Sequence, residues 1–257
     1  MLRYEKPHDL DDPDTTRYHR EIILQKRFLK RIYEDWYSTF TKNAINYPNG
    51  KFVEIGSGGG FLKDVFPEVI TSDILELDCC EMVFSAEKMP FEDKSLDMIM
   101  MVNVFHHIPH SRLFLDEAYR TLRENGKVVM VEPANTLFSR FIYRNFHHEP
   151  FEPTGDWEIE SSGPLSGANI ALPWIVFERD KAKFRSLYPD FEIKKITYHT
   201  PLRYLISGGV SMRALVPNWS YGFFTFLETL MSPLSRMLGM FVTIELIIPK
   251  SLANNDQ

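Results

Sequence analysis

The sequence predicts an α/β protein built around a doubly wound, mostly parallel β-sheet. Several short segments are apolar almost throughout, which is typical of strands buried on both faces of a parallel sheet. These segments alternate with helical patterns, and a glycine-rich loop directly follows the first of them. We therefore expect helices on both faces of the sheet and a ligand crevice where the strands end.

The composition is that of a packed globular protein. The chain has 257 residues, of which 44% are hydrophobic, 25% charged and 14% aromatic, with a formal net charge of −6. These values exclude a disordered chain, a collagen and a disulfide scaffold. The acidic balance also disfavours a nucleic-acid partner, because such proteins normally carry a basic surface.

The cysteines and the apolar stretches favour a cytoplasmic location. Cys79 and Cys80 are adjacent, and neighbouring residues make poor disulfide partners because their Cα atoms lie only about 3.8 Å apart. Residues 1–14 contain no apolar core of the kind that a secretory signal needs. Charged residues and a proline interrupt the most apolar stretch, residues 222–248, so no transmembrane helix is expected.

The N-terminal region is predicted to form one amphipathic helix over residues 16–40, capped by Asp14 or Thr15. Its apolar residues at helical spacing are Leu29, Ile32, Tyr33, Trp36 and Phe40. Its basic residues are interpreted as a solvated face, with an anionic ligand or a membrane surface as the alternatives.

The central region supplies most of the expected sheet. Strands are predicted over residues 51–55, 69–73, 82–85, 96–102 and 127–132, with a helix starting near Gly59 and another over 111–122. A right-handed crossover between parallel strands usually takes a dozen or more residues and includes a helix. Only residues 74–81 join the second and third strands, so we expect that helix to be missing or vestigial. Cys79 and Cys80 lie in this connection and are interpreted as small buried apolar residues rather than nucleophiles.

The pattern loosens after Pro133. Helices are predicted over residues 137–146, 170–187, 221–231 and 233–238, and strands over 191–198 and 240–248. Residues 149–167 are rich in proline, glycine, serine and acidic residues, which predicts a loop. Residues 166–173 and the pair Gly208 and Gly209 are interpreted as loops that close over a pocket.

The loop after the first strand contains Gly56, Gly58 and Gly60 at alternate positions. Glycines there allow the backbone to approach a ligand closely, and the following helix offers free N–H groups. A dinucleotide fingerprint would place its third glycine one residue later, where this chain has Phe61, so NAD fits less well. Asp73 ends the second strand, where a carboxylate can accept both hydroxyls of a ribose; the alternative is an Asp that only caps a turn.

Six motifs in order across residues 51–133 resemble those of class I S-adenosylmethionine-dependent methyltransferases, in the branch of small-molecule enzymes of quinone and secondary metabolism. The motifs are Glu54-Ile-Gly-Ser-Gly-Gly-Gly60, Asp73, Ala86-Glu-Lys-Met-Pro-Phe91, Ser95-Leu-Asp97, Asn103-Val-Phe-His-His-Ile108, and Leu122-Arg-Glu-Asn-Gly126 with Val131-Glu-Pro133. The C-terminal half is more loosely similar to that of some bacterial enzymes of polysaccharide or lipid-linked glycan assembly.

The resemblance implies a Rossmann-like seven-stranded sheet of order 3-2-1-4-5-7-6 with an antiparallel seventh strand. It also implies that S-adenosyl-L-methionine is the cofactor. Its methionine part would be held by Glu54, Gly56, Ser57, Gly58 and Gly60, its ribose by Asp73, its adenine edge by Ala86 and Glu87, and its methyl-bearing end would border Asn103. Many relatives have Asp where this chain has Ser85, so Glu87 or the backbone would replace that contact.

Three histidines are candidate catalytic residues. Methyl transfer from a sulfonium is an in-line displacement, which needs a base only if the acceptor must lose a proton. His106 and His107 follow the fourth strand, where the methyl group would emerge, and either is a candidate base; the alternative is that the pair builds the loop. His148, within the cluster His147-His148-Glu149, is a candidate for acceptor binding, with a capped surface turn as the alternative. No further ligand motif accompanies this cluster, so no metal site is predicted.

The sequence therefore predicts a single cytoplasmic methyltransferase domain over residues 1–257 that acts on a small acceptor, either apolar or linked to a lipid or glycan, with O-methylation preferred. Its predicted parts are an N-terminal cap (1–50), the cofactor core (51–133), acceptor-pocket insertions (134–190 and 200–239) and the last strands (191–199 and 240–249). No nucleic acid or transmembrane segment is expected; membrane-surface contact and a monomer or homodimer are both allowed. The alternatives are an NAD-dependent oxidoreductase and a catalytically silent cofactor-binding scaffold.

Overall fold

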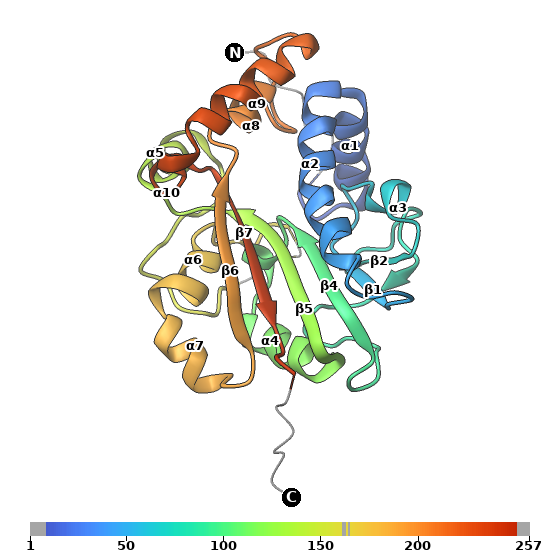
Figure 1. Cartoon of the computed structure of the whole chain (residues 1–257). Coiled ribbons are helices and arrows are strands. Elements are labelled where there is room, and N and C mark those ends of the chain that lie inside the picture. The colour runs from blue at the N-terminus through green and yellow to red at the C-terminus, as the bar shows by residue number, and fades with distance from the viewer. Residues whose placement is uncertain (1–8, 161–162, 164, 251–257) are drawn as a thin grey trace, which may run out of the picture.

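The computed structural model describes residues 9–160, 163 and 165–250, and these form one mixed seven-stranded sheet flanked by helices (Figure 1). The strand order is β3-β2-β1-β4-β5-β7-β6, as predicted. Strands β1 to β5 run parallel to one another, and β7 pairs antiparallel with both β5 and β6. The strands are β1 (Phe52–Ile55), β2 (Val69–Asp73), β3 (Met82–Val83), β4 (Leu96–Val102), β5 (Leu122–Pro133), β6 (Glu192–His199) and β7 (Phe241–Ile247).

Two hydrophobic cores lie on opposite faces of the sheet. Successive side chains of a strand point to opposite faces, so Met98 and Met100 of β4 join one core while Ile99 and Met101 join the other. Both faces are covered, which explains why the sequence of β4 shows no alternation of polar and apolar residues.

The helices are α1 (Pro13–Gln25), α2 (Arg27–Ala44), α3 (Leu62–Val65), α4 (Ser111–Thr121), α5 (Leu137–Phe146), α6 (Leu172–Trp174), α7 (Lys181–Leu187), α8 (Arg203–Ser207), α9 (Tyr221–Leu230) and α10 (Ser235–Leu238). Short 3-10 or π segments cover Phe105–His107, Ile175–Arg179, Asn218–Ser220 and Ser232–Leu234. Figure 1 shows α1 and α2 on one side of the carboxyl ends of the strands, opposite α8 and α9. No helix among the described residues combines the length and the apolar character needed to cross a membrane.

The prediction of one N-terminal helix is wrong. The chain breaks at Lys26, whose backbone leaves the helical region (φ −84°, ψ 86°), and two helices result. Lys26 Nζ donates to the carbonyl oxygens of Gly209 and Met212, so a tertiary contact accompanies the break. The cap of the first helix is Asp12 rather than Asp14 or Thr15, because Asp12 Oδ1 accepts the Asp14 N–H at 2.8 Å.

Further elements differ from the prediction. β5 begins at Leu122 rather than at residue 127, and the helix expected over residues 233–238 begins as a 3-10 turn, Ser232–Leu234. The helix after the glycine loop begins at Leu62 rather than Gly59, because residues 57–60 form a turn closed by the Gly60 N–H and the Ser57 carbonyl. The helix expected over residues 170–187 is divided by a π segment, Ile175–Arg179, and the chain leaves helical geometry at Asp180 before α7. The third strand contains only Met82–Val83.

The connection over residues 74–81 contains no helix, as the sequence predicts. The two cysteines there are partly buried and not disulfide-bonded, with their Sγ atoms 4.0 Å apart. The loop expected over residues 149–167 is present where the structure describes it; residues 161–162 and 164 of that prediction, and residues 1–8 of the N-terminal one, lie outside the described part of the chain.

Candidate functional site

A cavity of about 940 Å³ lies at the carboxyl ends of β1, β2 and β4. This volume is at the upper end of the range for ligand pockets, about 300–1,000 Å³, and leaves room for more than one small molecule. Its lining includes residues of the glycine loop and histidines after β4, together with residues of α1, α5 and α8. The insertions after β5 therefore complete a cavity that begins at the strand ends.

The glycine loop has a backbone that side chains would obstruct. Gly56 has φ +69°, and a Cβ there would lie 2.4 Å from the Val104 side chain. The Gly58 N–H donates to Asp73 Oδ2 at 3.0 Å, which joins the loop to the end of β2. Gly56 and Gly60 line the cavity, whereas Ser57 and Gly58 do not; Gly59, absent from the predicted set, does.

Two carboxylates of the predicted cofactor site are buried in the cavity wall. Glu54 is 3% exposed, its Oε2 atom has no hydrogen-bond partner among the described residues, and burial raises its pKa to about 7. Burial also raises the pKa of Asp73, although the N–H groups of Leu75 and Gly58 oppose this change by hydrogen bonding to the carboxylate. An unpartnered buried oxygen is costly, so Glu54 is suited to a cationic ligand group.

Asn103 stands at the end of β4 in the left-handed region, with φ +57°. Asn tolerates this conformation better than most residues. Its N–H donates to Val131 O at 2.9 Å, and its Oδ1 atom is buried without a hydrogen-bond partner among the described residues. Asn103 lines the cavity, so this oxygen is a second acceptor available to a ligand.

Ala86 and Glu87 follow β3 and line the cavity together with Ser85. Ser85 Oγ accepts the N–H of Glu87 at 3.2 Å, so this side chain caps the local turn. Glu87 Oε1 accepts the backbone N–H of His110 at 2.9 Å. The structure thus places the predicted adenine-edge residues on the cavity.

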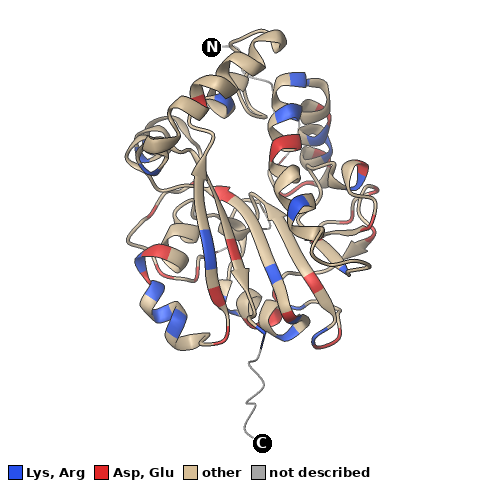
Figure 2. Ribbon diagram, viewed as in Figure 1, with Lys and Arg blue, Asp and Glu red and all other residues tan. Residues whose placement is uncertain are grey.

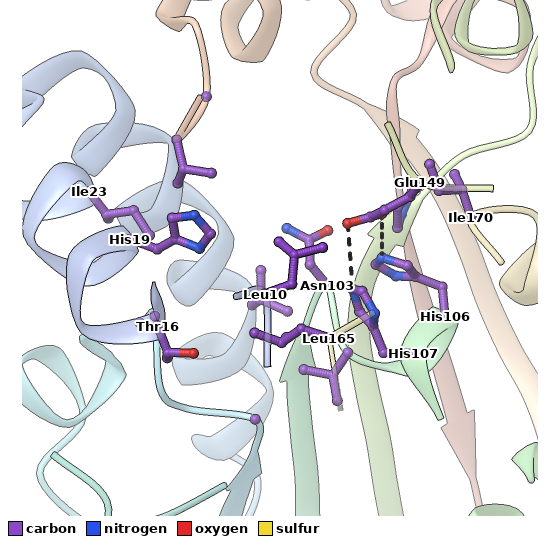
Figure 3. A pocket seen from close by; sticks show the side chains of 18 of the residues that line it. Leu10, Thr16, His19, Ile23, Asn103, His106, His107, Glu149, Leu165 and Ile170 are labelled. Atoms are coloured by element: carbon purple, nitrogen blue, oxygen red, sulfur yellow. Dashed lines mark ion pairs between the residues drawn. The ribbon is translucent and has the colours of Figure 1, made fainter. Parts of the chain in front are cut away.

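His106 and His107 lie on a short 3-10 segment directly after β4, and both rings approach Glu149 (Figure 3). His106 Nε2 lies 3.5 Å from Glu149 Oε2, and His107 Nε2 lies 3.8 Å from Glu149 Oε1. The opposite ring nitrogens have other partners: His106 Nδ1 lies 2.7 Å from Glu132 Oε2, and His107 Nδ1 lies 3.1 Å from the Gly167 carbonyl oxygen. We call His106, His107 and Glu149 the His-His-Glu cluster.

The two imidazoles of the cluster differ in charge. Burial alone would lower the pKa of His106, but Glu132 and Glu149 raise it to about 9. Burial and the neighbouring His106 lower the pKa of His107 to about 4. Both histidines, in their charged forms, hold the pKa of Glu149 well below its usual range against the effect of burial. At neutral pH His106 therefore carries the charge, while His107 is a neutral imidazole that can accept a proton.

His148 lines the cavity at its rim. Its side chain is half exposed, its Nε2 atom lies 3.8 Å from Glu149 Oε1, and its ring stacks on that of His147 at 4.9 Å. The structure brings it near the His-His-Glu cluster, in the insertion after β5, and its role in acceptor binding stays a prediction.

Two groups of residues at this site were not predicted from the sequence. One is the link from His106 and His107 to Glu149, more than forty residues later in the sequence. The other is the N-terminal segment, where Thr16 and His19 of α1 line the cavity. A signal for the first was Glu132, a carboxylate that directly follows the apolar run of residues 128–131 in β5. The N-terminal residues carry no motif that distinguishes them from a solvated helix.

The cavity is closed on one side by contacts between segments far apart in the sequence. Asp11 accepts hydrogen bonds from the N–H groups of Leu165 and Ser166, at 2.7 and 2.9 Å, and from the Ser166 hydroxyl at 2.6 Å. Leu165 lines the cavity. The segment before α1 and the loop before α6 therefore form part of its wall together, and the predicted closing role of this loop remains a prediction.

Residues 53–130 match the methyltransferase domain family. This region is therefore a methyltransferase domain, and the sheet that contains it has the strand order expected for the class I S-adenosylmethionine-dependent fold. It is similar to a demethylmenaquinone methyltransferase of Symbiobacterium thermophilum, with 26% identity over 155 residues, which are 57% of this chain and 61% of the relative. It is also similar to a phthiotriol/phenolphthiotriol dimycocerosates methyltransferase of Mycobacterium ulcerans, with 39% identity over 54 residues, which are 20% of each chain.

A solved SAM-dependent methyltransferase of Thermotoga maritima superposes on 89% of this methyltransferase chain and 99% of its own, with 18% identity and a TM-score of 0.49. The alignments with the two curated relatives leave more than a third of each of those proteins unmatched. The chain thus spans less than two thirds of the length of either curated relative.

S-adenosylmethionine is the cofactor of this domain, and the residues of the cavity fit it. The cofactor carries an ammonium, a ribose and a cationic sulfonium centre, which need carboxylate and other oxygen acceptors. The free oxygens of Glu54 and Asn103 and the carboxylate of Asp73 all lie on the cavity. The backbone of Gly56 and Gly60 is also exposed to it, as close approach requires.

Proposed function

We propose that the protein transfers a methyl group from S-adenosylmethionine to a hydroxyl oxygen of a small apolar acceptor, free or linked to a lipid or glycan. The observation that carries this proposal is the cavity, which combines a set of buried oxygen acceptors at the strand ends with the His-His-Glu cluster and an aromatic wall. Aromatic residues of this wall are Tyr33, Tyr37, Tyr143, Phe146, Tyr204 and Phe241.

The proposed cofactor site uses the residues nearest the glycine loop. Glu54 and the backbone at Gly56 and Gly60 would hold the methionine part, and Asp73 the ribose hydroxyls. Asn103 would border the methyl group. The enzyme then gains rate chiefly by holding the acceptor in line with the carbon–sulfur bond and by excluding water.

The proposed acceptor site lies beside the His-His-Glu cluster. His107 is the neutral imidazole there, so it would accept the hydroxyl proton as the oxygen–carbon bond forms and the carbon–sulfur bond breaks. Glu149 would hold the charge that His107 gains, and His148 at the rim would contact the acceptor.

An apolar acceptor is supported by two further observations. The two curated relatives are named for acceptors of quinone and lipid type, demethylmenaquinone and phthiotriol dimycocerosates. In addition, α5 and α9, next to the cavity, expose large apolar side chains, among them Phe141, Phe146, Phe223 and Phe226. An acceptor with a long apolar part could contact this surface while its polar end enters the cavity.

The test is a pair of measurements on the full-length protein. Calorimetric titration should show one bound S-adenosylmethionine, and labelled cofactor should transfer methyl to members of a panel of quinols, phenols and polyprenyl-linked sugars. Cofactor binding without turnover across the whole panel would support the silent scaffold instead. Binding of NAD and none of S-adenosylmethionine would overturn the proposal in favour of an oxidoreductase.

A further inference from the structure

Hydrogen bonds within the protein do not provide a partner for every polar atom of the His-His-Glu cluster. His106 Nδ1 lies 2.7 Å from Glu132 Oε2 and His107 Nδ1 lies 3.1 Å from the Gly167 carbonyl oxygen, so the partners place a proton on each Nδ1 atom. In the neutral rings, each Nε2 atom then presents a lone pair to the oxygens of Glu149. Two lone pairs and a carboxylate converge, and only a cation between them makes this arrangement favourable.

A proton can satisfy only part of the cluster. A proton on His106 Nε2 can be donated to Glu149 Oε2, which lies 3.5 Å away. The contact between His107 Nε2 and Glu149 Oε1, at 3.8 Å, then still has no donor. These distances are too long for strong hydrogen bonds. They are close to the separation of about 3.3 Å between two ligands that each lie about 2.0–2.1 Å from a tetrahedral Zn²⁺ ion.

We propose that His106 Nε2, His107 Nε2 and the Glu149 carboxylate bind a divalent transition-metal ion such as Zn²⁺. The three ligand atoms lie within 4.8 Å of one another. Two histidines and one carboxylate are a ligand set of catalytic zinc sites and of non-haem iron sites, which keep a position open for water or substrate. All three residues line the cavity, so the open position faces the proposed acceptor site.

The surroundings of the cluster are those of a metal site. Metal-binding histidines almost always donate their second ring N–H to a carboxylate or a backbone carbonyl, as His106 does to Glu132 and His107 to Gly167. Glu132 is itself fixed, because its Oε1 atom accepts the N–H groups of Val104 and Phe105 at 2.9 and 2.8 Å. The position of His106 is therefore set before any ion binds.

Charge also favours a cation here. Two carboxylates, Glu132 and Glu149, lie within 4 Å of ring nitrogens of His106. No Lys or Arg forms an ion pair with either carboxylate among those described in the structure, so the cation they attract is a proton on histidine or a metal ion. His147 and His148, with nitrogens 3.9 and 3.8 Å from Glu149, could supply a further ligand at the rim.

The chemical role of such an ion, unlike its binding, rests on the proposed function. A divalent ion in this position would lower the pKa of an acceptor hydroxyl at the open coordination site, so that the proton passes to water before methyl transfer. In the transfer the oxygen–carbon bond forms, the carbon–sulfur bond breaks and the neutral thioether leaves. The ion would then replace His107 as the group that activates the acceptor.

The experiment measures metal binding directly. Full-length protein, stripped with chelator, is titrated with Zn²⁺ against a chromophoric competitor and with Co²⁺ by visible absorption. We expect one bound ion per chain, with a dissociation constant below 10⁻⁵ M, and the intense Co²⁺ bands of a four- or five-coordinate site. Absence of a stoichiometric ion in the wild-type protein would overturn the proposal whatever the variants do.

Three variants locate the ion. Glu149→Gln keeps the shape of the side chain, and it and His107→Asn should each weaken Zn²⁺ binding about 10- to 100-fold. His110→Ala is the matched control, because His110 is a half-exposed histidine close to the cluster in sequence but outside it, and should leave binding unchanged. Equal affinity in the wild type and both ligand variants would place the ion elsewhere and overturn the assignment.

Parallel measurements separate this inference from the proposed function. S-adenosylmethionine affinity, thermal stability and methyl transfer are measured on stripped and Zn²⁺-loaded protein. Methyl transfer by protein that binds no Zn²⁺ would leave the function standing and the metal site rejected. Stoichiometric Zn²⁺ binding that depends on Glu149, in a protein without any methyl transfer, would support the metal site and reject the function.

Discussion

At the scale of single residues, Glu54 is a charged residue in a buried strand whose burial is best explained by ligand binding. It is the one charged residue of β1, and it stands where a strand buried on both sides reaches the cavity. Folding removes its carboxylate from water without giving Oε2 a partner, so the residue destabilises the fold in its ionised form. Such a cost at a cavity wall is typical of a binding residue, whose partner arrives with the ligand.

The raised pKa of Glu54 predicts that cofactor binding depends on pH. In the free protein the pKa is about 7, whereas an ammonium of the cofactor beside the carboxylate would favour the ionised form and lower it. Binding below pH 7 then requires loss of a proton, so affinity should fall by up to about tenfold per pH unit below 7 and be constant above 8. Calorimetry between pH 5.5 and 8.5 measures this. Glu54→Gln should remove the pH dependence, and an unchanged profile in that variant would contradict the assignment.

Asp73 provides a second test of the cofactor site. Replacing it with alanine should weaken S-adenosylmethionine binding by about 1–3 kcal/mol, because buried ribose hydroxyls would lose their acceptor. Asp78→Ala is the control, since Asp78 is exposed in the connection that follows β2. Calorimetric titration of both variants measures the difference. Equal affinities would reject the ribose contact and leave Asp73 as the residue that fixes Gly58.

His148 separates acceptor binding from cofactor binding. The side chain is half exposed at the rim, so His148→Ala should raise the KM for the acceptor about 2- to 10-fold through the loss of one hydrogen bond. The dissociation constant of S-adenosylmethionine should not change. Steady-state kinetics and calorimetry on the same preparation measure both. Weaker cofactor binding with normal acceptor kinetics in this variant would assign His148 to the cofactor site instead of the acceptor site.

The residues of the site differ in how far the sequence could predict them. Glu54, Asp73 and Asn103 each lie at or next to the carboxyl end of a strand, so the topology alone gathers them at one edge of the sheet. Glu149 belongs to a loop whose path depends on contacts such as that between the Ile170 N–H and the Pro150 carbonyl oxygen. Spacing along the chain contains no information on such contacts, so the approach of Glu149 to His106 and the metal site that we infer from it were not predicted.

At the scale of elements, buried apolar runs were predicted more accurately than elements whose bounds depend on distant contacts. An apolar run such as β4 has few alternatives, because every side chain but that of Val102 is buried. The division of the N-terminal helix at Lys26 depends instead on carbonyl groups of residues 209 and 212, which the local pattern does not contain. The same holds for the π segment before α7, where the hydrophobic period continues and only the backbone geometry changes.

An ion-pair network attaches the C-terminal helices to the N-terminal cap, and its loss should destabilise the protein. Arg203 of α8 donates to Asp35 of α2 and to Glu228 of α9, both at 2.5 Å, and to the hydroxyl of Tyr221 at 2.6 Å. Arg203→Ala leaves the buried Glu228 without its cation, which should lower the free energy of unfolding by about 3–5 kcal/mol. Urea unfolding measures this. The exposed Arg213→Ala is the control, and a loss below about 1 kcal/mol in Arg203→Ala would show that the network contributes little.

At the scale of the whole molecule, the cofactor core and the acceptor-facing parts have different origins in the sequence. The core is one continuous region, and its family match covers residues 53–130. The remaining walls of the cavity come from both ends of the chain, α1 and α2 on one side and α5 and α8 around the other (Figure 1). If the acceptor lies in this cavity, as we propose, its class depends on segments to which the family match does not extend, and it has to be tested through their surfaces.

The surface of α9 predicts contact with a membrane. Glu228 is the only charged residue of this helix and it is buried, while Phe223, Phe226 and Leu230 are exposed on it, as Figure 2 illustrates by the nearly charge-free ribbon. Trp219, which precedes α9, is 84% exposed. Apolar and aromatic side chains on one helix are typical of proteins that lie in the membrane interface, where a lipid-linked acceptor would also be. We therefore expect the protein to bind lipid vesicles through α9.

Co-sedimentation with phosphatidylcholine–phosphatidylglycerol vesicles tests this expectation. The double variant Phe223→Ser with Phe226→Ser should bind at least tenfold more weakly, because each aromatic side chain that enters the interface contributes on the order of 1 kcal/mol or more. Leu187→Ser is the control, since Leu187 is exposed on α7 at the opposite end of the sheet (Figure 1). Methyl transfer to a soluble, short acceptor should be equal in all three proteins, because none of these residues lines the cavity. Equal vesicle binding by the double variant and the control would mean that α9 packs against another protein or remains in water, and that the acceptor reaches the cavity from solution.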